Sequence, residues 1–74
     1  MIVVKSIDQS AQKRVRNSIK AYLEGLQNFG WIAGIIAKEN KTLEARQMLV
    51  ELKNYPGVAV RYEELLTWLD LQLS

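Results

Sequence analysis

The chain has 74 residues, of which 49% are hydrophobic, and it contains neither histidine nor cysteine. This composition excludes catalysis by imidazole or thiol groups, metal binding by those side chains, and disulfides. The formal charge of +2 does not by itself indicate a nucleic-acid-binding protein, because such proteins concentrate basic residues on one face.

The length of the chain predicts a single domain, residues 1–74, with a small core. A domain of this size buries only about 60% of the surface that its unfolded chain exposes, so its stability is marginal. Small domains often add disulfides, a structural metal or a partner subunit, and the first two need side chains that this sequence lacks. We therefore expect self-association, with a dimer favoured, or a complex with another protein.

Apolar runs in the sequence are short. The N-terminal run Ile2–Val4 is well below the roughly 7–15 residues of a signal-peptide core. The longest run, Trp31–Ala37, is well below the roughly 20 residues that cross a bilayer. We expect a cytoplasmic protein with no membrane partner.

The first helix is predicted over residues 7–28. Ser6 and Gln9 have the spacing of a capping box, which places the helix start close to them. Residues 2–4 are a candidate for a very short extended segment, and Gly30 offers the left-handed conformation that often follows a helix. Apolar residues at helical spacing define the buried stripe of this helix: Ala11, Val15, Ile19, Tyr22, Leu23 and Leu26.

Two short helices are predicted next, over residues 31–39 and 42–54. The first of them, from Trp31 onward, is apolar on every side, which predicts a central element surrounded by protein. Thr42 is a candidate cap for the second, whose predicted buried face consists of Ala45, Met48, Leu49 and Leu52. Residues 54–57, Asn-Tyr-Pro-Gly, predict a turn, since proline fixes φ and glycine can adopt a positive φ.

The last helix is predicted over residues 59–72 and completes an all-α fold, a compact bundle of about four short helices. Its predicted buried face consists of Val58, Tyr62, Leu65, Leu66, Leu69 and Leu73. A second apolar surface lies elsewhere on this helix, which either another helix of the same chain or a partner must cover. We expect an interface with a second copy or another protein here, formed by Val60, Glu64, Trp68 and Leu71.

Four basic residues gather on the outer side of the first helix and define the basic ridge: Lys13, Arg14, Arg16 and Lys20. The ridge is either a solvated helix face or a contact surface for nucleic-acid phosphates or an acidic protein. The charge distribution is uneven, because residues 1–37 carry five basic and two acidic side chains, whereas residues 38–74 carry five and six.

Other chemical motifs are weak. A helix-turn-helix drawn through residues 31–53 has no glycine in its turn, and Glu44 and Glu51 on its second helix would repel phosphates. Adjacent Glu63 and Glu64 diverge by about 100° on a helix, so they do not converge on one metal ion. The four glycines match no phosphate-binding pattern.

These patterns favour a small non-catalytic helical module that acts through protein interactions, self-associates through its C-terminal helix and has a regulatory role. The alternative is a small dimeric DNA-binding transcriptional regulator that uses the basic ridge, with nucleic acid the less favoured partner. We expect no enzyme activity, and neither hypothesis involves a cofactor, a metal or a small-molecule substrate.

Overall fold

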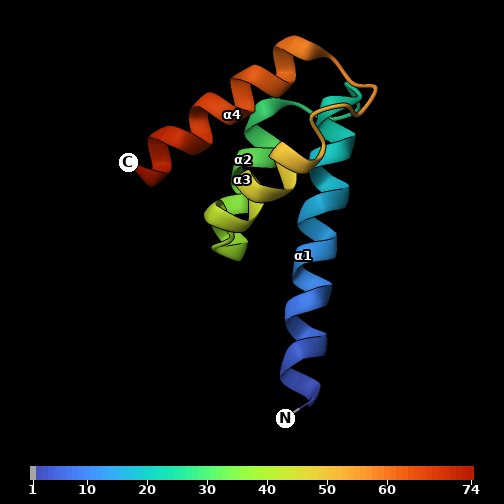
Figure 1. Ribbon diagram of the computed structural model, residues 1–74, viewed down its shortest axis with the longest axis vertical. Helices are drawn as coiled ribbons and strands as arrows, with labels where there is room; N and C mark the ends of the chain where they lie inside the picture. The colour runs from blue at the N-terminus through green and yellow to red at the C-terminus, as the bar shows by residue number, and fades with distance from the viewer. Residues whose placement is uncertain (1) are drawn as a thin grey trace.

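In the computed structural model, the backbone is described for residues 2–74 and the side chains for residues 10–74. The chain forms the helices α1 (Ile2–Leu23), α2 (Phe29–Glu39), α3 (Thr42–Glu51) and α4 (Ala59–Leu73), and residues 2–74 contain no strand. The predicted all-α bundle of four short helices is confirmed. The long α1 runs along one side of the bundle, and its N-terminal turns extend beyond the other helices (Figure 1).

The start of α1 differs from the prediction. The helix begins at Ile2 and passes through Ser6, so the predicted capping box and the extended segment at residues 2–4 are both wrong. The sequence contains the reason, since Ile7 stands four residues before Ala11 and continues the helical spacing toward the N-terminus. A serine within such a pattern is a weak break, because its intrinsic helix propensity is only slightly unfavourable.

The end of α1 comes five residues earlier than predicted. Gly25, with φ of 87°, follows the helix in the left-handed region, the role that the sequence had suggested for Gly30. The amide of Gly25 donates to the Tyr22 carbonyl, and the amide of Leu26 donates to the Ala21 carbonyl, each at 3.0 Å. These two bonds form a Schellman motif. Leu26 therefore lies outside the helix with 70% of its surface exposed, and its predicted place in the buried stripe is wrong.

The second helix is not the central element that its apolar sequence predicted. Ile32 and Ile36 are fully buried, whereas Trp31 is 37% exposed and Ala37 also faces solvent. In a bundle of four short helices, each helix has too few neighbours to be surrounded, so α2 packs through one face only. The helix begins after Asn28, whose side chain accepts a hydrogen bond from the Trp31 amide at 2.8 Å. It ends at Glu39, and the next residue, Asn40, adopts a left-handed φ of 55°.

The core is built by buried side chains from all four helices: Val15, Ile19, Tyr22, Leu23, Ile32, Ile36, Ala45, Met48, Leu49, Leu65 and Leu69. Most of them belong to the predicted stripes, which confirms the helical periodicity as a guide to the buried faces. Val58 and Leu73 were predicted in the buried face of α4, but they are 47% and 42% exposed. Both lie at the ends of that helix, where fewer neighbouring side chains cover them.

The connections on either side of α3 also correct two predictions. Thr42 is the first residue of α3 rather than its cap, and Lys41 precedes the helix. In the turn before α4, Gly57 does not have the positive φ that the sequence suggested. Its glycine is required by close packing instead, because a Cβ there would lie 2.8 Å from both the Cβ and the carbonyl oxygen of Leu23. The next amide, of Val58, donates to the same Leu23 carbonyl at 2.9 Å.

Candidate functional site

The four residues predicted as an interface lie together on one surface of α4. Val60, Glu64, Trp68 and Leu71 line a single shallow groove, and we call this surface the outer face of α4. Val60 is 72% exposed and Leu71 is 66% exposed, while Trp68 is half-buried. The alternative in which another helix of the same chain covers this surface therefore fails for Val60 and Leu71.

Phe29, at the start of α2, completes the groove and was not predicted as a site residue. Its ring meets the Trp68 indole edge to face, with the centroids 5.8 Å apart. The same ring meets buried Tyr22 at 6.0 Å with an interplanar angle of 75°. Three aromatic rings thus connect the outer face of α4 to the core. No pattern in the sequence pointed to Phe29, because it belongs to α2 whereas the other residues of the groove belong to α4.

Glu64 connects the same surface to α1. Its carboxylate accepts a hydrogen bond from the Tyr22 hydroxyl at 3.1 Å. Burial of the phenol, followed by this hydrogen bond and the negative charge of Glu64, raises the pKa of Tyr22 to about 12. One carboxylate oxygen of Glu64 therefore already accepts a hydrogen bond within the chain.

The only basic residue of α4, Arg61, is directed away from the outer face. Its guanidinium donates to the carbonyl oxygens of Tyr22 at 2.9 Å and Gln27 at 2.7 Å, and it lies 5.0 Å from the centroid of the Tyr22 ring. The charged side chains that line the groove are Glu63 and Glu64. The outer face of α4 therefore combines apolar residues with a negative charge.

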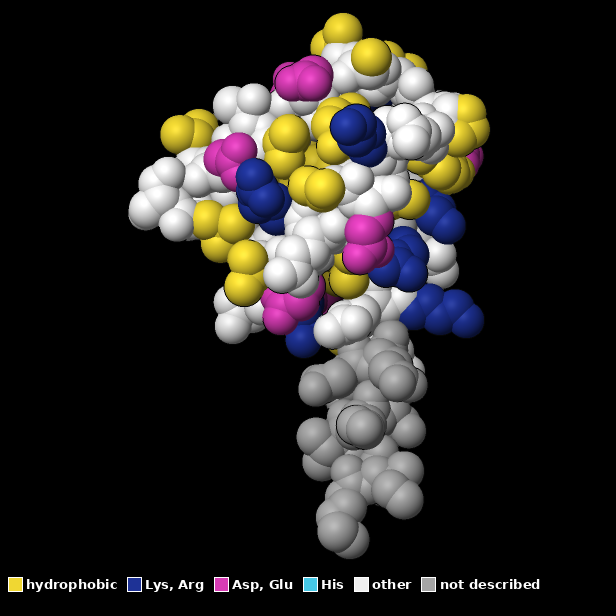
Figure 2. Space-filling view, viewed as in Figure 1, with side chains coloured by type: hydrophobic (Ala, Val, Ile, Leu, Met, Phe, Trp, Pro, Cys, Tyr) yellow, Lys and Arg dark blue, Asp and Glu magenta, His cyan; other side chains and the backbone are white. Residues whose placement is uncertain are grey.

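Only three of the four residues of the basic ridge share one surface in the structure. Lys13, Arg16 and Lys20 line one concave surface of α1, whereas Arg14 turns aside and pairs with Glu39 of α2 at 3.3 Å. Figure 2 shows basic side chains grouped on the side of the molecule where α1 runs. Arg16 forms an ion pair with Glu51 of α3 at 3.1 Å. Two of the four ridge cations thus have carboxylate partners within the chain, in pairs that are largely exposed and hence weak.

Residues 10–74 lack the features that mark metal sites and unsatisfied buried polar sites. Among residues 10–74, no three acidic side chains come together in a way that could hold a metal ion. The buried side-chain nitrogen and oxygen atoms of these residues all have hydrogen-bond partners. None of the described helices has an apolar stretch long enough to cross a bilayer.

No family model, curated protein or solved structure matches this chain. Its function is therefore inferred from its own residues, and above all from the outer face of α4.

Proposed function

We propose that the protein is a cytoplasmic, non-catalytic helical interaction module that self-associates through the outer face of α4. The main support is that two strongly exposed apolar residues, Val60 and Leu71, share one groove with Trp68. Scattered exposed apolar side chains are common, but a contiguous group of them is typical of an interaction surface. Tryptophan is also among the residues that contribute most to binding when they lie at the centre of an interface.

The spacing of residues along α4 suits a second copy of the same helix. Val60 and Leu71 are separated by about three helical turns and lie on the same side, with Glu64 and Trp68 between them. When two α4 helices pack antiparallel about a two-fold axis, Val60 of each copy lies opposite Leu71 of the other. Glu64 then lies opposite Trp68. A symmetric contact of this kind uses the same apolar residues twice and closes as a dimer.

The charge of the groove makes this association sensitive to salt. Two copies bring Glu63 and Glu64 close to the same residues of the partner, while Arg61 remains engaged with α1. Repulsion between these carboxylates weakens the dimer at low ionic strength, and added salt screens it. A basic or nucleic-acid partner would give the opposite dependence, with binding that weakens as salt is added. The direction of the salt effect therefore separates the two kinds of partner.

Sedimentation equilibrium over a range of protein and salt concentrations tests the proposal. We expect a dimer for the wild type and a folded monomer for Val60→Ser/Leu71→Ser, because both residues are exposed in the single chain. The matched control is Leu26→Ser/Leu43→Ser, which removes two exposed leucines outside the groove, 70% and 53% exposed. A wild type that stays monomeric throughout contradicts self-association. A control that dissociates the dimer as fully as the groove variant contradicts the assignment of the surface.

The second candidate is a dimeric DNA-binding transcriptional regulator. It is supported by the shared surface of Lys13, Arg16 and Lys20, which also includes the amide side chain of Asn17. It is less favoured because Arg14 and Arg16 have acidic partners within the chain.

Fluorescence anisotropy with a labelled DNA duplex tests this second candidate at several salt concentrations. Binding that falls steeply with salt, and that the Lys13→Ala/Arg16→Ala/Lys20→Ala variant loses, would support it. The matched control is Lys38→Ala/Lys41→Ala, which removes basic residues outside that surface. No binding to any duplex at low salt rules out the candidate.

A further inference from the structure

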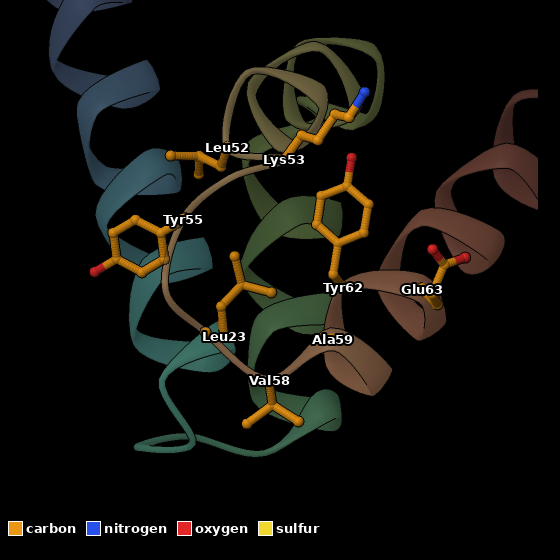
Figure 3. A pocket seen from close by; sticks show the side chains of 9 residues that line it. Leu23, Leu52, Lys53, Tyr55, Val58, Ala59, Tyr62 and Glu63 are labelled. Atoms are coloured by element: carbon orange, nitrogen blue, oxygen red, sulfur yellow. The ribbon is translucent and has the colours of Figure 1, made fainter.

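A pocket of about 320 Å³ lies on the other side of Glu63 from the outer face of α4, where the loop between α3 and α4 crosses the end of α1 (Figure 3). Leu23, Leu52 and Val58 line it with apolar surface, and Tyr62 borders it from α4. The charged residues at its rim are Lys53 and Glu63. The volume is at the lower end of the roughly 300–1,000 Å³ typical of small-molecule sites.

The loop that forms this pocket is fixed to α1. Gly57 packs directly on Leu23, and the Val58 amide donates to the Leu23 carbonyl at 2.9 Å. Farther along the loop, the Tyr55 hydroxyl donates to the carboxylate of Glu24. Because these contacts hold the loop in place in the single chain, the pocket exists without a ligand, and binding does not have to order it.

The polar groups of the pocket lie at one end. The Lys53 ammonium and the Tyr62 hydroxyl are on the same side of the opening, while Leu23 and Val58 lie at the opposite end (Figure 3). Among residues 10–74, neither of these polar groups takes part in an ion pair or a side-chain hydrogen bond. The Glu63 carboxylate points away from Leu23 and Val58 (Figure 3). Two hydrogen-bond donors, one of them charged, are therefore available at the end of an apolar pocket.

We propose that this pocket binds small organic acids, with the carboxylate at Lys53 and Tyr62 and a compact apolar group against Leu23 and Val58. A carboxylate accepts hydrogen bonds from both donors, and its charge complements the ammonium. Two sources supply this chemistry, a free monocarboxylic acid and the C-terminal residue of a peptide. The proposal does not depend on self-association, since the groove residues Val60, Trp68 and Leu71 do not line the pocket.

NMR titration of the ¹⁵N-labelled full chain with 4-phenylbutyrate tests the proposal, with 4-phenylbutanamide as a neutral probe of the same shape. We expect amide shifts centred on Leu23 and residues 57–59, and an affinity for the acid about tenfold above that for the amide. A tetrapeptide that ends in phenylalanine, compared with its C-terminal amide, tests the second source. If the peptide binds and 4-phenylbutyrate does not, the result supports recognition of a carboxylate and identifies the ligand as the C-terminus of a peptide.

The Lys53→Gln variant should reduce the affinity for the acid to that for the amide. Lys38→Gln is the matched control, because Lys38 is also an exposed lysine but lies outside the pocket. Tyr62→Phe should lower the affinity for the acid several-fold and leave that for the amide unchanged. Equal binding of acid and amide, an unchanged affinity in Lys53→Gln, or no shifts with millimolar acid or peptide would each overturn the proposal.

Discussion

The indole of Trp68 and the phenyl ring of Phe29 meet at right angles, with an interplanar angle of 90° and 5.8 Å between their centroids. This contact joins α4 to the beginning of α2, and the Phe29 ring continues to Tyr22 in the core. Trp68 therefore serves two purposes, since part of its surface stabilises the fold and the rest lies in the groove. A substitution of Trp68 would therefore change both the stability of the fold and the surface of the groove.

Replacing Phe29 with alanine tests this aromatic connection. Phe29→Ala removes a half-buried ring, and we expect the free energy of unfolding to fall by about 2 kcal/mol, below the value for a fully buried phenylalanine. Dimerisation should weaken as well, because Trp68 loses its support. Urea unfolding followed by circular dichroism measures the first effect. Phe29→Leu is the control and should retain most of the stability, whereas wild-type stability in Phe29→Ala would contradict the role of the ring.

The buried phenol of Tyr22 predicts a loss of stability at alkaline pH. Its pKa is raised to about 12 in the folded chain, from the usual 10, with burial as the largest cause. Below pH 10 the Tyr22 phenol is protonated in both the folded and the unfolded state, and its full contribution to stability is present. As the pH rises from 10 to 12 the unfolded state ionises first, so folding loses on the order of 2–3 kcal/mol.

Urea unfolding of the wild type and of Tyr22→Phe, compared between pH 8 and pH 12, measures this contribution. The difference in stability between the two proteins should shift in favour of Tyr22→Phe as the pH rises. Glu64→Gln is expected to lower the pKa of Tyr22 only in part, because burial remains. An unchanged difference across this range would show that the phenol is not buried in solution.

Two glycines that differ in their surroundings give a matched pair of substitutions. Gly57→Ala places a methyl group 2.8 Å from Leu23 and should destabilise the fold by about 1–3 kcal/mol. Gly34→Ala meets no atom within 4 Å and lies inside α2, so it should stabilise by about 0.5–1 kcal/mol. Thermal unfolding of both variants measures the two shifts. Wild-type stability in Gly57→Ala would contradict the close approach of the loop to α1.

The cap of α2 provides another test of local structure. Asn28→Ala removes the side-chain acceptor for the Trp31 amide and should reduce the free energy of unfolding by about 1 kcal/mol. Asn28→Asp keeps an acceptor and adds a negative charge at a helix start, so its stability should be at least that of the wild type. Guanidinium unfolding distinguishes the two variants, and equal losses in both would show that the hydrogen bond does not stabilise the helix.

The arrangement of the core could be predicted from the sequence better than the helix boundaries. The spacing of Val15 and Ile19, or of Leu65 and Leu69, requires only that one face of a helix be buried. Helix starts and ends depend on small differences in local free energy, and neighbouring patterns easily override them. This is why Ser6 does not begin α1 and why Gly25 rather than Gly30 takes the left-handed conformation.

Site residues could be predicted only where one helix supplies them. Val60, Trp68 and Leu71 share a side of α4, so the helical repeat alone places them together. The contribution of Phe29 to the groove required the packing of α2 against α4. The pocket beside Lys53 combines α1, a loop and α4, and its residues have no common spacing in the sequence.

Arg61 holds both ends of the connection between α1 and α2, because it binds the carbonyl oxygens of Tyr22 and Gln27. Proteases cleave segments that can leave the surface and become extended in their active sites. Although Leu26 is highly exposed, the segment around it is retained by a side chain of the last helix. Cleavage after Leu26 should therefore require α4 to detach first, so the rate of digestion at this bond reports how often the C-terminal helix opens.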